Sequence, residues 1–145
     1  MKKSILSLIL LSLLIYSCRS NELKEPQKYD YITSGALTDD CFQIIITIPP
    51  DREFRTMADQ RENAFIKAKD SIPAETEKQI IDFYASDKAI NINDLPEEKI
   101  NILKEKSIVY SKQGIIDQEY YLIDNSAVLV YRIFKNGIKN EILNN

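Results

Sequence analysis

Few residues in this chain are equipped to do chemistry, and the two cysteines stand out among them. The 145-residue sequence holds cysteine only at positions 18 and 41, and it has no histidine. Without an imidazole the chain lacks the usual general base near neutral pH, the commonest metal ligand and the partner of a serine or cysteine nucleophile. It also lacks a glycine-rich phosphate loop and the paired-cysteine spacing of a metal site. The sequence therefore predicts no catalytic residues, no metal, no cofactor and a protein that is not an enzyme.

The residues ahead of Cys18 form three physically different pieces. Lys2 and Lys3 make a positive start, residues 4–15 are an apolar run interrupted only by serines, and a short exit leads to the cysteine. A helix over residues 5–16 would be roughly 18 Å long at about 1.5 Å per residue, much shorter than the ~30 Å hydrocarbon core of a bilayer. The segment therefore indicates a signal peptide that spans residues 1–17.

The exit from this segment, Ile15-Tyr16-Ser17-Cys18, resembles the lipobox of bacterial lipoprotein precursors. Ile15 and Ser17 match that pattern, whereas Tyr16 is bulkier than the residue usually found there. With this tyrosine the motif is similar to the looser lipoboxes of other lineages, including spirochaetes. The resemblance implies cleavage before Cys18, a diacylglyceryl thioether on its sulfur and a fatty acyl chain, such as palmitate, on its new amino group. The alternatives are a disulfide between Cys18 and Cys41 in a secreted domain, or an uncleaved anchor.

The rest of the chain divides into a tether and one domain. Residues 18–27 are polar and charged with almost nothing to bury, which is typical of a short spacer above a membrane. Residues 28–145 are long enough and apolar enough for a single globular domain. If Cys18 is acylated, Cys41 has no partner in the chain, and its place before an apolar run predicts a buried, reduced thiol. An exposed or intermolecular thiol is the alternative.

Apolar periodicity predicts one strand followed by three helices. Residues 42–48 are consecutively apolar and β-branched up to a proline pair, which favours a central strand buried on both faces. The first helix is expected over residues 54–72, with Phe65 buried against that strand, because apolar residues recur there at steps of three and four. Pro73 suits the start of a second helix, and a third is expected to begin near Asp94 and to end near Lys106.

The C-terminal part of the chain reads as a strand meander. Residues 107–111, 119–123 and 127–134 are rich in Ile, Val and Tyr, and residues 124–126 supply a turn. Asn136-Gly137 predicts a hairpin that returns the chain through residues 138–142 as an edge strand. The expected fold is α+β, with helices on one face of a mostly antiparallel sheet, in strand-helix-helix-helix-strand meander order. In layout and composition this body is similar to small outer-membrane lipoproteins of spirochaetes.

Polar clusters give little sign of a ligand site. Asp39-Asp40 lacks the glycine-bearing acidic loop of a calcium site, so a solvated turn is expected. Three tyrosines of the predicted sheet, Tyr120, Tyr121 and Tyr131, form a candidate contact surface. Tyr120 and Tyr121 should face opposite sides of their strand.

The charge and the leader together set the functional expectation. From Cys18 onward the chain carries 17 basic and 22 acidic side chains, which argues against a nucleic-acid partner. We expect a lipoprotein held to the cell envelope by acyl chains on Cys18, whose domain contacts an envelope or surface protein. Arg19 favours the outer over the inner membrane, because it is not the retention aspartate of enterobacterial lipoproteins. The alternative is a module that binds a small molecule or carbohydrate on the tyrosine-bearing sheet.

Overall fold

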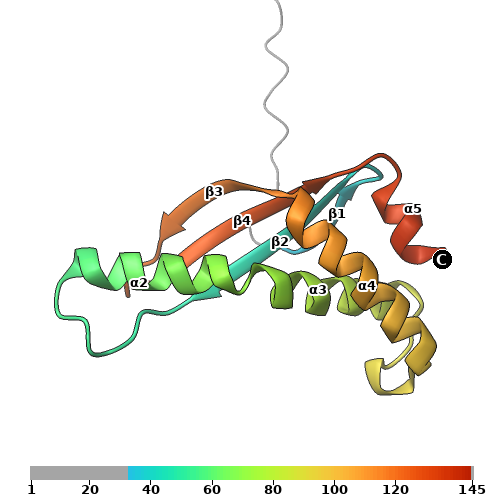
Figure 1. Ribbon diagram of the computed structural model, residues 1–145, viewed down its shortest axis with the longest axis horizontal. Coiled ribbons are helices and arrows are strands. Elements are labelled where there is room, and N and C mark those ends of the chain that lie inside the picture. The colour runs from blue at the N-terminus through green and yellow to red at the C-terminus, as the bar shows by residue number, and fades with distance from the viewer. Residues whose placement is uncertain (1–32, 145) are drawn as a thin grey trace, which may run out of the picture.

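The computed structural model describes residues 33–144; the predicted signal peptide, Cys18 and the predicted tether lie outside this range. The elements follow in the order β1 (Gly35–Thr38), β2 (Cys41–Ile48), α2 (Met57–Asp70), α3 (Ile72–Asp87), the 3₁₀ turn η1 (Ile92–Asp94), α4 (Glu97–Gln113), β3 (Ile115–Tyr121), β4 (Ala127–Phe134) and α5 (Ile138–Leu143). The four strands form one antiparallel sheet in the order β1-β2-β4-β3, and the helices lie against one face of it (Figure 1). The expected α+β class is confirmed.

The two central strands, β2 and β4, supply the floor of the core. They pair in an unbroken antiparallel register from Cys41 opposite Phe134 to Ile48 opposite Ala127. Because side chains alternate along a strand, every second residue points to the helices. These fully buried residues are Phe42, Ile44 and Ile46 of β2 with Leu129 and Ile133 of β4. The strand predicted at residues 42–48 is therefore present and central.

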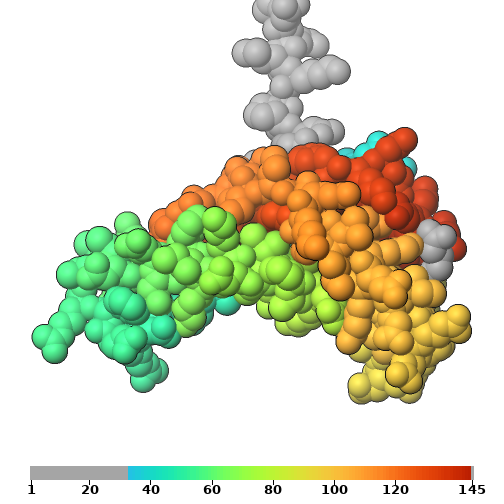
Figure 2. All heavy atoms as spheres, in the orientation of Figure 1, coloured from blue at the N-terminus to red at the C-terminus, as the bar shows by residue number. Residues whose placement is uncertain are grey.

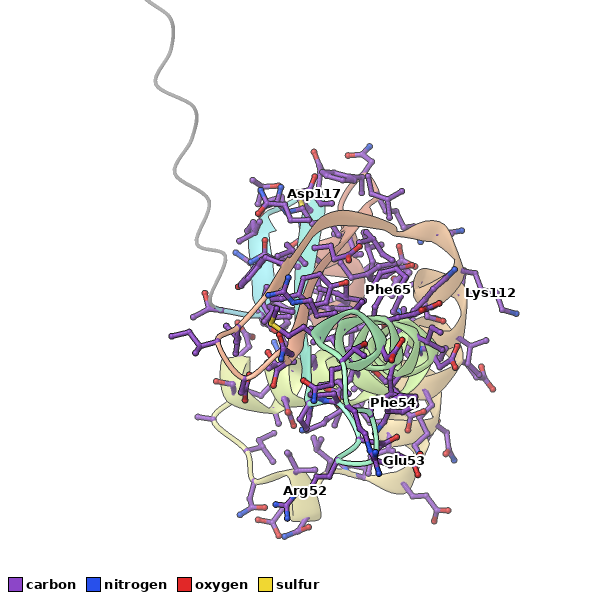
Figure 3. All side chains as sticks on the ribbon, turned by 90° about the vertical axis from the view of Figure 1, so that its left-hand side faces the viewer. Arg52, Glu53, Phe54, Phe65, Lys112 and Asp117 are labelled. Carbon is purple, nitrogen blue, oxygen red and sulfur yellow. The ribbon has the colours of Figure 1, made fainter. Side chains whose placement is uncertain are left out.

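Helices α2 and α3 form a row that runs along the sheet (Figure 1). Thr56 caps α2, because its hydroxyl oxygen accepts a hydrogen bond from the backbone N–H of Asp59 at 3.1 Å. The first helix is thus shorter than the predicted 54–72. Its fully buried residues are Ala64 and Ala68, whose small side chains let the helix approach the strands, while Phe65 is only half-buried at the edge of the core (Figure 3).

Helix α4 is longer than predicted and replaces the first strand expected in the C-terminal part of the chain. Residues 107–111 were expected as a strand, but they belong to α4, which continues to Gln113. Leu103, Ser107 and Tyr110 are buried at steps of four and three, the period of one helix face. The β-branched Ile108 and Val109 point to solvent instead. Packing of this face on α3 and β4 overrides the strand preference of the local sequence.

The predicted edge strand at residues 138–142 is also wrong. Gly137 adopts the left-handed conformation, with φ of 68°, and it precedes the helix α5 rather than a hairpin return. Ile138 and Ile142 are four residues apart and both fully buried, which suits one face of a helix. The outer edge beside β2 is formed by β1, which the sequence analysis did not identify.

The turn before β2 holds α5 in place. The Asp40 carboxylate accepts a hydrogen bond from the backbone N–H of Gly137 at 2.6 Å, and the backbone carbonyl of Asp40 accepts one from Lys135 N–H at 3.0 Å. The carbonyl of Asp39 accepts from Lys139 N–H at 3.1 Å. The acidic pair therefore has a structural role in this turn.

Leu103→Ala tests the corrected extent of α4 and its packing. Leu103 is fully buried, so truncation should lower the free energy of unfolding by about 2–5 kcal/mol, from lost burial and the cavity left behind. Urea denaturation followed by circular dichroism measures this change. Ile108→Ala is the matched control on the same helix, since Ile108 is 52% exposed and should cost less than about 1 kcal/mol. Equal losses for the two variants would contradict the helix face described above.

Candidate functional site

The three tyrosines proposed as a contact surface do not come together. Tyr131 is 4% exposed and belongs to the core, where its hydroxyl donates to the carbonyl of Ser111 at 2.8 Å. Tyr121 is half-buried against the helices, and Tyr120 is exposed on the opposite face, as the alternation of a strand requires. The prediction of a shared surface is therefore wrong for Tyr131, and Tyr120 is the most exposed of the three.

The feature that the sequence analysis missed lies at the end of the same hairpin. The tip that joins β3 to β4 presents two exposed aliphatic residues: Leu122 is 42% exposed and Ile123 is completely exposed. Both fall within the strand predicted at residues 119–123, because Leu122 and Ile123 continue the apolar run that precedes the turn residues. We refer to Leu122, Ile123 and Asp124 as the hairpin tip.

The turn that carries the hairpin tip has a defined geometry. Asn125 N–H donates to the Leu122 carbonyl at 3.0 Å, and Leu122 N–H donates to the Ser126 carbonyl at 2.9 Å. Asn125 adopts the left-handed conformation, with φ of 63°, which asparagine tolerates better than most residues. The Asp124 carboxylate accepts from Ser126 N–H at 3.0 Å, and this hydrogen bond lowers the pKa of Asp124. Ile123 thus stands at the apex of a turn where polar residues are usual.

Two side chains of α2 hold Asn125, the residue that follows the hairpin tip. The Asn125 amide donates to Gln60 Oε1 at 2.7 Å, and its oxygen accepts from Arg61 Nε at 3.1 Å. The Arg61 guanidinium also lies 5.2 Å from the centre of the Tyr121 ring. Burial, together with the hydrogen bond that the Tyr121 hydroxyl donates to Glu119, raises the pKa of Tyr121 to about 12. The tip is therefore fixed in place, and little conformational freedom remains to be lost when it binds a partner.

A groove lies at the other end of the α2–α3 row. It has a volume of about 360 Å³ and is formed where the end of α3 meets the loop through η1 and the start of α4. The groove residues are Tyr84, Ile90, Leu95, Pro96, Glu98, Lys99 and Ile102. Figure 2 shows the segment around residues 90–100 (yellow) projecting at the end opposite the start of α2 (green). Lys99 Nζ lies 4.4 Å from the centre of the Tyr84 ring, so a cation and the Glu98 carboxylate accompany the apolar residues of this groove.

A second groove beside α3 is more polar. It has a volume of about 390 Å³ and is lined by Ser34, Lys78, Gln79, Asp82, Phe83 and Ser86. Gln79 of its lining donates to the Ile45 carbonyl at 3.1 Å and to the Glu75 carboxylate at 3.2 Å. Lys78 and Ser86 are exposed to solvent. This groove lacks the enclosed, mostly apolar wall of a typical small-molecule site.

Residues 33–144 contain no group of three or more acidic, cysteine or histidine side chains placed to hold a metal ion. Cys41 is buried, 6% exposed, and this burial raises the pKa of its thiol. Cys18, the predicted lipid-attachment residue, lies outside the described residues. In the same described range, no helix combines the length and apolar character needed to cross a bilayer.

No match to this chain was found among protein-family models, among curated proteins or among solved structures. The hairpin tip and the groove are therefore interpreted from their own geometry.

Substitution of Asn125 separates the two ways in which it supports the hairpin tip. Asn125→Gly keeps the left-handed backbone but removes the hydrogen bonds to Gln60 and Arg61, so we expect a loss of about 1–3 kcal/mol in the free energy of unfolding. Asn125→Ala should cost about 1 kcal/mol more, because a Cβ is unfavourable at positive φ. Urea denaturation measures both losses, and Asn101→Ala, on the exposed side of α4, is the control. If the hydrogen bonds to Gln60 and Arg61 do not stabilise the fold, Asn125→Gly and Asn101→Ala will have the same free energy of unfolding.

The Cys41 thiol gives a second measurement. In a Cys18→Ser background Cys41 is the only thiol, and its burial together with its raised pKa should make alkylation slow in the folded protein. Reaction with iodoacetamide, followed by mass spectrometry, should accelerate at least tenfold in denaturant. Rapid labelling of the folded protein would mean that Cys41 is exposed.

Proposed function

We propose that this chain is a bacterial lipoprotein, anchored to the cell envelope through acyl chains on Cys18, whose non-enzymatic domain contacts an envelope or surface protein. The proposal of a lipid anchor rests on the order of residues 1–18: two lysines, a short apolar run, and a cysteine preceded by Ile15-Tyr16-Ser17. Each of these features has a separate physical role, since charge orients the segment, apolar length directs export, and the cysteine supplies the nucleophilic sulfur for acylation.

The proposed modification is sufficient to account for membrane residence. Each buried methylene contributes about 0.8 kcal/mol, and although a single fatty chain binds a bilayer only marginally, two or three chains make release very slow. The polar tether at residues 18–27 would leave the domain free to meet partners above the surface. Arg19 favours the outer membrane on the resemblance to other lipoproteins.

The hairpin tip supports a contact role for the domain. Exposed aliphatic side chains at the apex of a turn contribute little to the core. A partner that covers them gains up to about 1.5–3 kcal/mol for a side chain that is fully exposed beforehand, and less for one that is already partly covered. Ile123 and Leu122 meet this condition, and the clamp by Gln60 and Arg61 holds them in one geometry. Most of the binding energy of an interface often comes from a few residues that fill pockets on the partner.

The alternative, a carbohydrate or small-molecule module, has less support. Its proposed platform required several tyrosines on one face, whereas Tyr131 lies in the core and Tyr121 under Arg61. The residues between helices and sheet are also closely packed, with Leu103, Ile80 and Phe42 fully buried.

Cys18→Ser tests the anchor. Without the sulfur neither acylation nor the cleavage that follows it can proceed, so the variant should remain as uncut precursor and should not incorporate a labelled fatty acid. Mass spectrometry of the parent chain should find a mature N-terminus at Cys18 that carries acyl chains. Cys41→Ser is the matched control and should leave processing unchanged. A mature chain that begins elsewhere, or an unmodified Cys18, would rule out the lipoprotein assignment.

A further inference from the structure

We propose that the hairpin tip of one copy of this chain binds the groove of a second copy, so that the domains associate head to tail. The inference rests on the proposed contact role of the tip, and it names the partner. Both halves of the contact are on the same chain, and they lie at opposite ends of it. The tip is tied to Gln60 and Arg61 near the start of α2, whereas the groove begins at Tyr84 near the end of α3.

The distance between the two sites follows from the helix row. Gln60 and Tyr84 are 24 residues apart, and α2 and α3 run nearly in line (Figure 1). At about 1.5 Å per residue the two sites are therefore about 36 Å apart. The Leu122–Ile123 tip is too far from the groove of its own domain to fill it, so only another molecule can bring the two together.

The two surfaces match in apolar character. The tip projects Ile123 beyond the end of the hairpin, with Leu122 beside it. The apolar part of the groove lining includes Ile90, which is 41% exposed, and Leu95, which is buried. Docking would remove from water two sets of aliphatic groups that the fold of a single domain leaves uncovered.

The charges at the two ends are also complementary. Asp124 follows Ile123 in the tip, and Arg61 lies at its base. The groove carries Lys99 and Glu98. Lys88 Nζ also lies 5.9 Å from the ring of Tyr84, a groove residue, so cations outnumber the anion at the groove. The exposed Asp124 carboxylate of the tip can therefore approach Lys99. Such pairs at a rim contribute mainly to orientation and partner choice.

The position of the sites determines the kind of assembly. A projection that binds a groove elsewhere on the surface is a heterologous contact, which continues from molecule to molecule unless the rotation closes it into a ring. The contact is small compared with a stable interface, so association in dilute solution should be weak. Anchoring to one membrane would raise the local concentration of domains and favour the assembly there.

Disulfide cross-linking of the full chain in membranes of the expressing cell tests this arrangement. Ile123→Cys places a thiol on the tip, and Ile90→Cys places one at the groove rim. When the two variants are co-expressed with different epitope tags, mild oxidation should give a mixed dimer at least tenfold above the parent chain. A chain that carries both substitutions should give a ladder of higher oligomers. Each variant expressed alone should give no dimer above the parent level.

Two controls make the result specific. Ile66→Cys places a thiol on α2, outside both surfaces, at a position that is 49% exposed compared with 41% for Ile90, and it should not cross-link with Ile123→Cys. Lys99→Glu in the Ile90→Cys chain reverses the charge at the groove and should reduce the mixed dimer severalfold, whereas Lys112→Glu, at the far end of α4, should not. Circular dichroism of each variant verifies folding.

The outcomes distinguish this inference from the proposed function. Dimers of Ile123→Cys alone would mean tip-to-tip contact and would overturn the head-to-tail arrangement. If no mixed dimer forms while Cys18 is acylated in the same cells, self-association is rejected and the lipoprotein assignment stands. A mixed dimer that persists in the Cys18→Ser background supports the contact even if the anchor assignment fails.

Discussion

The fold depends on the pairing of β2 with β4, two strands separated by most of the described chain. Their register is continuous over the whole length of both strands, so one alternation decides which residues face the helices. A slip by one residue would turn Phe42, Ile44 and Ile46 away from the helices and bring polar residues into the core. The helices α2, α3 and α4 lie between the two strands in sequence, so their placement depends on this pairing being formed.

A buried polar contact fixes the register from the other face. Arg132 of β4 is 5% exposed, donates from Nε to Gln43 Oε1 on β2 at 3.0 Å, and pairs with the Asp117 carboxylate of β3 at 2.8 Å. A bulge between Ile116 and Gln118 allows Asp117 to reach it. A buried charge without such partners would be costly, so a shifted register would be disfavoured both by apolar residues on one face and by this arginine on the other. The three strands are thereby locked to one another.

The sequence was informative where a pattern has only one structural solution. Residues 42–48 were identified as a central strand because they form an unbroken apolar run, residues 127–134 as a strand because they are rich in Ile, Val and Tyr, and Pro73 fits the start of α3. It was misleading where short-range preference and packing disagree. Ile108 and Val109 favour a strand locally, yet the spacing of Leu103, Ser107 and Tyr110 extends α4 past them. Asn136-Gly137 favours a hairpin, but the burial of Ile138 and Ile142 selects a helix.

The hairpin tip could not be predicted from the sequence, because its apolar residues follow a strand without a break. From sequence alone, Leu122 and Ile123 look like the end of a buried strand, because apolar residues are assigned to the core by default. The structure ends β3 at Tyr121, and the Gln60 and Arg61 contacts to Asn125 then place the turn outside the core. Apolar residues that the core does not use are informative, since the fold gives no reason for their side chains. At both ends of the α2–α3 row such residues remain, as a projection at one end and as a concave surface at the other. The α2–α3 row therefore separates an apolar projection from an apolar groove, which is the arrangement that the proposed head-to-tail contact requires.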